Sequence, residues 1–446
     1  MMIGSGSRFL PWKGINDVNR AIRHVVSHAG KNVSFYREAF NNARVCASVI
    51  RGIDDLPALP VTDRLELMAG GPAFYLRQGA DPLKLTVKHT TGTTGTPVMI
   101  HMNFMEQAFR KLTLLDSFRR NAKLTFPFEM VDVGPEQKDQ STKVFQQAGP
   151  VKIIRLFRAM PLEDQIEILR RSKPALILGR PSTLWQLALA FQQKAVRPPA
   201  PRLVLTGAEM LFPHVHLLLE DVFGCRVADY YNCEEVGNLA WECPEHSDRM
   251  HPNTATSWME AVDRDGNPVP NGQEGRLVVT NLYNHTMPFI RYALGDRGIL
   301  LDSEACSCGF TGPVMRLTEG RDENFIILPD GKEITPRLMY DVVNTGFPHD
   351  EPGWHLIDYI KTFQIVQEDR DLIVVKAVPG PLYSETIWRE VQNNIQRLHP
   401  AFRFQSVLVE DLSPEPGRKF HQIHSSHNSR WRREQNTQSE SGENSR

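Results

Sequence analysis

The densest group of chemically useful side chains lies between Thr90 and Pro97, where five threonine hydroxyls and two glycines share eight residues. Hydroxyls and free backbone N–H groups suit phosphate oxygens, and glycine lets the backbone come close to them. No Gly-Lys-Ser/Thr ends the segment, so it differs from the lysine-bearing phosphate loop of many nucleotide-binding proteins. A plain Thr/Gly hairpin turn stays open as the alternative. The residues that would hold phosphate are Thr90, Thr91, Gly92, Thr93, Thr94 and Gly95.

A second candidate segment carries an acidic pair. Glu234 and Glu235 follow Tyr230-Tyr231-Asn232-Cys233, at the end of a strand that we expect to begin near Arg226. Ligands and metals collect beyond the carboxyl ends of strands in α/β sheets. Magnesium is bound in proteins by carboxylates together with phosphate oxygens. The pair therefore suggests a magnesium site, although a solvated loop is the simpler interpretation of an isolated Glu-Glu.

Three later segments carry further polar candidates. Asp296 follows a glycine after the run that starts at Pro288, where an acidic side chain can accept hydrogen bonds from a ribose diol. Gly320-Arg321-Asp322-Glu323-Asn324 lies at a change in sequence character. Pro416-Gly417-Arg418-Lys419 lies near the end of the ordered pattern, where a basic side chain is by default a surface charge.

Cysteine and histidine spacing suggests a metal site. Cys243 and His246 form a Cys-x2-His pair, His251 follows, and Cys306-x-Cys308 lies downstream. Two such pairs suit a four-coordinate structural zinc, since all ligand positions are then filled by protein. Both histidines remain open as the fourth ligand, and we favour His251. The alternative is a set of independent buried thiols with surface histidines.

The elements that must position these residues indicate α/β architecture. Between about Lys84 and Leu282, short apolar strands alternate with helical stretches, as in 175–178, 183–194 and 203–205. Ser182 is expected to cap the helix that follows Pro181. A helical entry segment is expected over 17–40.

The pattern changes near Gly320. A hairpin is expected over 324–335 with its turn at Asp330-Gly331, and a second strand pair over 363–366 and 372–375. Apolar residues recur at helical spacing from Ile387 to Leu398, and a strand is expected over 404–409. We therefore predict a large α/β domain over 1–320 and a small α+β domain over 321–425. The polar tail 426–446 is expected to be disordered.

Composition narrows the choice of partners. The 446 residues contain 51 basic and 52 acidic side chains, so net charge gives no reason to expect a nucleic-acid or membrane-surface partner. We find no apolar run long enough to span a bilayer, and Met1 to Gly14 lacks the pattern of a signal peptide. A cytoplasmic location is expected, where the six cysteines are not a disulfide framework.

Taken together and in this order, the segments resemble the adenylate-forming superfamily of acyl-CoA synthetases, adenylation domains and luciferases. The Thr-Gly loop is similar to that family's phosphate loop, and Tyr231 to Glu235 to its Tyr-Gly-x-Thr-Glu motif. Arg291-Tyr292 through Asp296 resembles its Arg-Tyr-x-x-Gly-Asp segment. Gly320-Arg321 resembles its hinge, and Lys419 falls where its small mobile domain carries a catalytic lysine. The similarity covers roughly residues 15 to 425.

The sequence also resembles one branch of this superfamily, and it departs from the superfamily's motifs at several positions. Phe35-Tyr36-Arg37, the short length and the segment 240–243 look most like the phenylacetate-CoA ligase and CapK-like branch, whose members resemble this chain in their cysteine–histidine site. Asn232 stands where the family has glycine, and Glu234 where it has Thr or Ser. The hinge acid is Glu323 followed by asparagine. Arg418 stays open as an alternative register for the lysine.

The resemblance implies a two-step reaction. A carboxylate attacks the ATP α-phosphate to give an acyl-adenylate and pyrophosphate, and a nucleophile, by default the CoA thiol, then takes the acyl group. Substrate placement and spreading of phosphate charge would lower the barrier. The small domain would rotate about its hinge between the steps. The implied roles are phosphate binding by Thr91, Thr93 and Thr94, magnesium binding by Glu235, ribose binding by Asp296 and Arg321, an adenine-side contact by Glu209, further AMP-pocket contacts by Tyr231 and Asn232, hinge motion at Glu323 and catalysis by Lys419.

The substrate and acceptor are less constrained. The acid pocket is expected between Gly179, Pro181 and Ser182, the Glu209 segment and Tyr230, and its aromatic side chains would suit an aryl or arylacetic acid. An amine, a sugar hydroxyl or a carrier-protein thiol could replace CoA, as in capsule or natural-product pathways. A catalytically idle nucleotide-binding protein is the alternative from another class. The resemblance alone suggests a homodimer.

Overall fold

The computed structural model describes residues 15–89, 99–135, 144–302, 306–319, 325–344, 359–412 and 421–426. The chain forms two compact units. The first comprises Met1–Leu211 and Val215–Thr318, and the second Phe212–His214 and Glu319–Arg446. Several predicted site residues lie outside the described residues, as does the tail expected to be disordered. They are Thr90, Thr91, Gly92, Thr93, Thr94, Gly95, Arg321, Glu323, Arg418 and Lys419.

The first unit begins with a cluster of short helices. The expected single helical segment over 17–40 is instead two helices, α1 (Ile15–Asn32) and α2 (Ser34–Asn42), because Val33 between them adopts an extended conformation. Buried side chains of α1, such as Ile22 and Val25, join the core that the strands of the unit share. The remaining elements are η1 (Ala47–Val49), η2 (Ile53–Ala58), α3 (Arg64–Met68), α4 (Pro72–Tyr75) and η3 (Pro82–Lys84).

A hairpin fixes the two ends of the Thr-Gly loop. Strands β1 (Thr86–His89) and β2 (Met99–Met102) pair antiparallel, with His89 opposite Met99. Helix α5 (Phe104–Asn121) starts directly afterwards. Its N-cap Asn103 and Glu106 form a reciprocal capping box, which satisfies two backbone N–H groups at this helix start.

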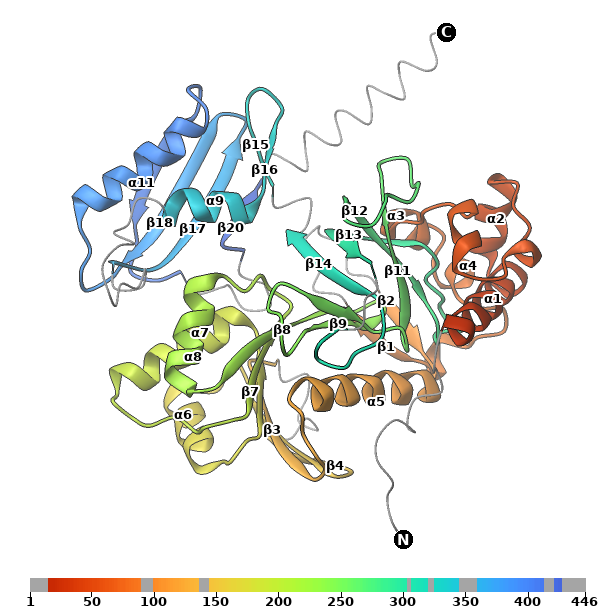
Figure 1. Cartoon of the computed structure of the whole chain (residues 1–446), viewed down its shortest axis with the longest axis horizontal. Helices are drawn as coiled ribbons and strands as arrows, with labels where there is room; N and C mark the ends of the chain where they lie inside the picture. Colours follow the sequence, from red (N-terminus) through yellow and green to blue (C-terminus); the bar gives the residue numbers. More distant parts are fainter. Residues whose placement is uncertain are drawn as a thin grey trace. The chain divides into compact units, whose positions relative to one another are not determined.

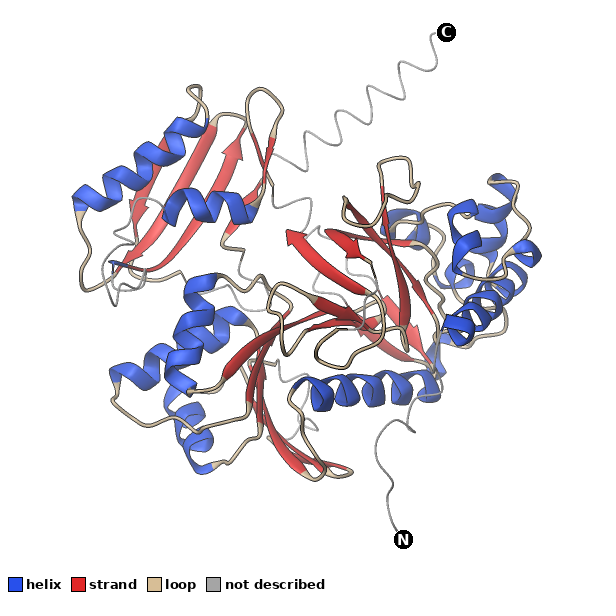
Figure 2. Cartoon of the chain, in the orientation of Figure 1, coloured by secondary structure: helices blue, strands red, loops and turns tan. Residues whose placement is uncertain are grey.

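The described residues of the first unit form a twelve-stranded sheet with a parallel and an antiparallel half (Figures 1 and 2). Its strand order is β11-β12-β13-β14-β10-β9-β8-β7-β6-β3-β5-β4. The parallel strands are β3 (Phe128–Val133), β5 (Val151–Leu156), β6 (Leu176–Gly179), β7 (Leu203–Gly207) and β8 (Arg226–Cys233), with β4 (Phe145–Ala148) antiparallel at the edge. The helices between them are α6 (Leu162–Arg171), α7 (Pro181–Gln193) and α8 (Pro213–Phe223).

The alternation of strands and helices expected as far as Leu282 stops earlier. From Gly237 onward the unit continues as strands without helices among its described residues. These are β9 (Gly237–Glu242), β10 (Met250–Pro252), β11 (Ser257–Val262), β12 (Glu274–Asn281), β13 (Tyr292–Leu301) and β14 (Val314–Glu319). The expectation was wrong because apolar runs alone do not distinguish hairpins from crossovers. The turn around Asp263, whose carboxylate accepts from Asp265 and Asn267 N–H groups, returns the chain antiparallel.

Both faces of the parallel half are covered, as apolar side chains on parallel strands require. On one face, Phe118 of α5 packs in a cluster with Leu205 and Ala228. Helices α6, α7 and α8 lie on the other side (Figure 2). The predicted cap at Ser182 is wrong. Helix α7 begins at Pro181 with Arg180 as N-cap, because proline at the first helical position sets the start.

The second unit is an α+β fold, as expected. The short hairpin of β15 (Ile326–Ile327) and β16 (Glu333–Ile334) confirms the expected hairpin. Long strands β17 (Ile360–Asp369) and β18 (Leu372–Pro379) confirm the second pair. The other elements are α9 (Pro336–Asn344), α11 (Glu385–Leu398), β19 (Arg403–Leu408) and β20 (Ile423–Ser425), and the sheet order is β19-β18-β17-β20.

None of the helices in the described parts of either unit combines the length and apolar character that a membrane span requires.

Candidate functional site

The predicted site segments of the first unit meet at one edge of the sheet. Strands β6, β7 and β8 are parallel neighbours, so their carboxyl ends fall on the same side. They end at Gly179, Gly207 and Cys233, and the expected pocket residues follow each end. The fold therefore brings together segments that lie more than fifty residues apart.

Glu209 joins two of these segments directly. Its Oε2 atom accepts a hydrogen bond from the backbone N–H of Ser182 at 3.2 Å, in the first turn of α7. A carboxylate is stabilised there by the exposed N–H groups and the helix dipole. Three buried polar atoms of Glu209 and of the first residues of α7 have no hydrogen-bond partner among the described residues: Ser182 Oγ, Trp185 Nε1 and Glu209 Oε1. Buried polar atoms are normally paired, so these atoms are available to hydrogen-bond to a polar ligand or to water.

Tyr230 is fixed across the end of β7. Its ring packs edge to face on Phe118 and lies so close to Gly207 that a Cβ atom there would be 2.5 Å from Tyr230 Cε1. Burial, followed by the charge of Asp132, raises the pKa of Tyr230. The phenol therefore stays protonated and can donate a hydrogen bond at this edge.

Gly207→Ala is expected to lower the free energy of unfolding by about 1–3 kcal/mol, because the added methyl group overlaps the Tyr230 ring. Chemical denaturation would measure the loss. In a Tyr230→Ala background the same substitution should cost markedly less, since the ring that it meets is gone. An equal cost in both backgrounds would contradict the close contact as its cause.

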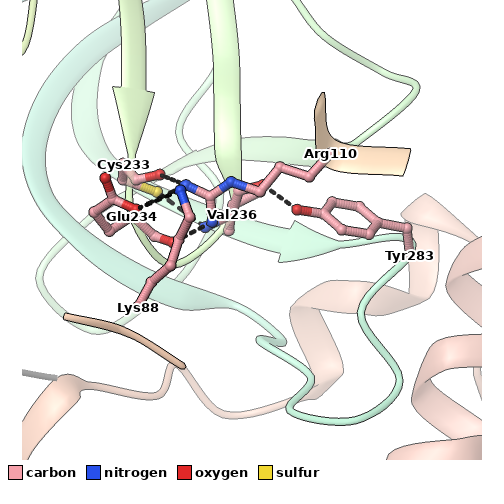
Figure 3. A network of polar contacts seen from close by, with 6 residues as sticks. All are labelled: Lys88, Arg110, Cys233, Glu234, Val236 and Tyr283. Carbon is pink, nitrogen blue, oxygen red and sulfur yellow. Dashed lines mark hydrogen bonds and ion pairs between the residues drawn. The ribbon is translucent and has the colours of Figure 1, made fainter. Parts of the chain in front are cut away.

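The acidic pair lies in the tight turn between β8 and β9, and this turn is held at several points (Figure 3). Arg110 of α5 donates to the carbonyl oxygens of Glu234 and Cys233. The Val236 N–H donates to Cys233 Sγ at 3.4 Å, and the Tyr283 hydroxyl donates to the Val236 carbonyl at 2.8 Å. The turn is therefore a rigid support for the carboxylates that it carries.

Glu235 is oriented by a tyrosine from another strand. Tyr292, the first residue of β13, donates its hydroxyl hydrogen to Glu235 Oε1 at 3.2 Å. Burial and the neighbouring Glu235 carboxylate raise the pKa of Tyr292, so the phenol keeps its proton. Oε2 has no hydrogen-bond partner in the described part of the chain. One fixed carboxylate with an available oxygen fits Mg2+, which completes its shell with phosphate oxygens and water.

Asp296 forms a similar pair with Tyr231. The Tyr231 hydroxyl donates to Asp296 Oδ2 at 2.6 Å, which connects β8 to β13 across the edge. The pairing of β8 with β9 shifts register between Tyr231 and Asn232, so the strand is irregular where the family pattern has glycine. Two tyrosine–carboxylate pairs thus connect β8 and the turn after it to β13.

Arg291 anchors the start of β13. Its guanidinium is buried, pairs with Glu260 at 3.2 Å and donates to the carbonyl oxygens of Leu59 and Gly266. A buried charge with this many partners is well satisfied, and it fixes the backbone next to Tyr292. The arginine of the predicted motif therefore holds the backbone of β13, the strand that carries Tyr292 and Asp296.

The cysteine–histidine residues form a separate cluster, with Cys243 directly after β9, His251 on β10, and Cys306 and Cys308 in the segment before β14. One ligand atom from each of Cys243, His251, Cys306 and Cys308 lies within 4.8 Å of the others. The Cys308 sulfur lies 3.2 Å from His251 Nε2. His246 is not in the cluster, and its Nε2 contacts Ser307 Oγ at 2.9 Å. Three thiols and one imidazole at this spacing fit a tetrahedral zinc ion.

Sequence reasoning missed the partners of the acids. Arg110 stands 124 residues before Glu234, and Lys88 contacts the same carboxylate from β1. No spacing rule links such distant positions. The available signal was local: Lys88 lies two residues before Thr90, where the Thr-Gly segment begins, and Arg110 lies in the helix that follows the segment.

Comparisons with known proteins agree with this geometry. No protein-family model matches the chain. It is 27% identical over 349 residues to a phenylacetate-coenzyme A ligase of Thermus thermophilus, covering 75% of this chain and 76% of the relative. It is 24% identical over 295 residues to protein CapK of Staphylococcus aureus, with 62% and 61% covered.

Solved structures share the fold. A 2-hydroxyisobutyryl-CoA ligase in the postadenylation state, in complex with R3-HIB-AMP, superimposes with a TM-score of 0.74 at 18% identity, covering 95% of this chain and 92% of that one. ATP-bound MatB from Rhodopseudomonas palustris gives a TM-score of 0.51 at 14% identity, with 82% and 71% covered. With the motifs above, these similarities support the resemblance of the chain to the adenylate-forming ligases, and to the phenylacetate-coenzyme A ligases and CapK among them.

Proposed function

We propose that this chain activates a carboxylic acid with ATP, releases pyrophosphate and transfers the acyl group to the thiol of CoA. The observation that carries the proposal is the pair of oriented acids, Glu235 on Tyr292 and Asp296 on Tyr231, at the carboxyl edge of the sheet. The phenylacetate-coenzyme A ligase relatives and the CoA-ligase neighbours support both halves of the reaction.

In the first step a carboxylate oxygen of the substrate forms a bond to the ATP α-phosphorus, and the bond to the β-phosphate oxygen breaks. Glu235 would hold Mg2+ with phosphate oxygens, and the ion supplies neutralisation of the phosphate charge. Asp296 accepts hydrogen bonds from the ribose hydroxyls, and Arg321 is proposed to assist it. Lys419 is proposed to contact the acyl and phosphate oxygens. In the second step the thiol sulfur attacks the acyl carbon and AMP leaves.

The acid would bind beside Tyr230, between the first turn of α7 and Glu209. Gly179 and Pro181 shape this entrance, and Ser182 Oγ offers an unpaired polar atom. The aromatic side chain and the apolar sheet floor favour an aryl or arylacetic acid. The named substrates of the relatives point to the same class.

The decisive experiment is acid-dependent ATP–pyrophosphate exchange with a panel of aryl, arylacetic, fatty and amino acids. One class should support exchange, and Lys419→Ala should lower it about a hundredfold. The same variant should still transfer the acyl group from supplied acyl-adenylate to CoA. Absence of exchange with every acid, in folded and magnesium-replete protein, would refute the proposed adenylation.

A different acceptor is the second candidate, and the similarity to CapK favours it. An amine, a sugar hydroxyl or a carrier-protein thiol would then replace CoA after the same adenylation. Preformed acyl-adenylate, offered with each acceptor in turn, separates these possibilities. Fast release of AMP with CoA alone would support the first candidate and exclude the second.

We also propose that Cys243, His251, Cys306 and Cys308 bind a structural zinc ion. All four ligand atoms come from protein, which leaves no open position for a reacting group. The ion would join the end of β9 and β10 to the segment before β14, in addition to the strand pairing that already connects β9, β10 and β14.

A further inference from the structure

Two cations flank the Thr-Gly segment in the sequence, although the segment itself has none. The segment Thr90 to Pro97 contains no lysine or arginine, so its threonines and N–H groups alone would face a highly charged triphosphate. Lys88 lies on β1, two residues before Thr90, and Arg110 lies on α5, which starts just after β2. The β1–β2 hairpin places both ends of the loop at His89 and Met99, one register step from Lys88.

The two cations converge on one carboxylate oxygen (Figure 3). Glu234 Oε2 lies 3.0 Å from Arg110 Nη2 and 3.4 Å from Lys88 Nζ. The Glu234 side chain is 42% exposed and that of Lys88 33%, so a ligand in solution can reach this carboxylate. Arg110 is only 10% exposed, which keeps its guanidinium aimed at the same point.

The Glu234 carboxylate is not what holds the turn in place. The turn is fixed through backbone atoms, by Arg110 on the Glu234 carbonyl and by Tyr283 on the Val236 carbonyl. Gly237 has a φ of +99°, and a Cβ there would lie 3.2 Å from Arg110, so backbone and guanidinium fit closely. The Glu234 side chain can therefore swing away while Glu235 stays oriented.

We propose that Lys88 and Arg110 form a binding site for the phosphates of ATP, and that Glu234 is a tethered anion that occupies this site until nucleotide displaces it. The proposal rests on the proposed function and adds residues that the family motif does not contain. The Lys88–Glu234 ion pair is partly exposed and therefore weak, so a triphosphate that also brings magnesium can replace the Glu234 carboxylate. Glu234 thereby lowers the affinity for nucleotide, because its charge competes with the phosphates.

Calorimetric titration of the full chain with Mg-ATP tests this competition. Glu234→Gln should tighten ATP binding about three- to tenfold, since the competing charge is removed without changing the shape of the side chain. Lys88→Ala should weaken binding about tenfold. Lys111→Ala is the matched control and should bind ATP as the parent does, because Lys111 is an exposed neighbour of Arg110.

The double variant separates competition from a general charge effect. With Lys88 removed, Glu234→Gln should tighten ATP binding less than it does in the parent, because one of the contested cations is gone. Equal tightening in both backgrounds would overturn the tethered-anion role, and weaker binding by Glu234→Gln would identify Glu234 as a metal ligand instead. ATP binding by the parent without acid-dependent exchange would count against the proposed function alone.

Discussion

Glu235→Gln is expected to lower acid-dependent ATP–pyrophosphate exchange by about a thousandfold, because the substitution removes the carboxylate placed for magnesium. The amide keeps the size of the side chain and can still accept from Tyr292, so the turn should stay folded. The apparent magnesium affinity should fall together with the rate. A titration of exchange against Mg2+ at saturating ATP measures both.

Tyr292→Phe provides the graded comparison. It removes the 3.2 Å hydrogen bond to Glu235 but leaves the charge, so exchange should fall only about tenfold. Excess magnesium should restore part of this loss, and it should not rescue Glu235→Gln. If Glu235→Gln exchanged at the parent rate, the magnesium role would have to pass to another acid, with Glu234 the nearest candidate.

The parallel half of the sheet could be predicted because its local signals agree. The short apolar runs that form β6 and β7 are typical of buried strands, and the apolar residues after Pro181 recur at helical spacing. Loops separate these three elements in the sequence. The antiparallel half could not be separated from it by the same signals. Strand β9 is buried on both faces throughout and β12 over its last five residues, so these stretches show no alternation that would distinguish them from parallel strands.

In the candidate site, too, some residues could be predicted from local sequence and others could not. Glu235, Asp296 and the cysteine pairs could be proposed from the sequence because each lies in a short segment of unusual composition. The side chains that orient them could not, since Tyr292 meets Glu235 across 57 residues and Arg110 meets Glu234 across 124. Such contacts depend on strand order and on the position of α5, which local periodicity does not determine.

The choice between the two histidines also needed the fold. His246 lies nearer to Cys243 in the sequence, in a Cys-x2-His spacing that is common in zinc sites. The β9–β10 hairpin instead places His251 opposite Trp241, buried and beside Cys308. Proximity along the chain was therefore a weaker guide than strand register.

Loss of the proposed zinc ion is expected to destabilise the first unit by about 5 kcal/mol, because metal binding contributes directly to folding where ligands come from separate strands. The purified protein should contain one zinc per chain by elemental analysis. Cys306→Ser and His251→Ala should lose this metal, and a strong chelator should reproduce the drop in thermal unfolding temperature.

The matched control is His246→Ala, which should keep both the metal and the unfolding temperature, since His246 contacts Ser307 and not the cluster. Cys46→Ser, at an exposed thiol, should also be neutral. If the zinc is structural, chelation should abolish exchange only as unfolding proceeds, with rate and folded fraction falling together. Loss of exchange from a fully folded, zinc-free chain would instead place the ion in the reaction, and equal zinc content in His251→Ala would remove that residue from the ligand set.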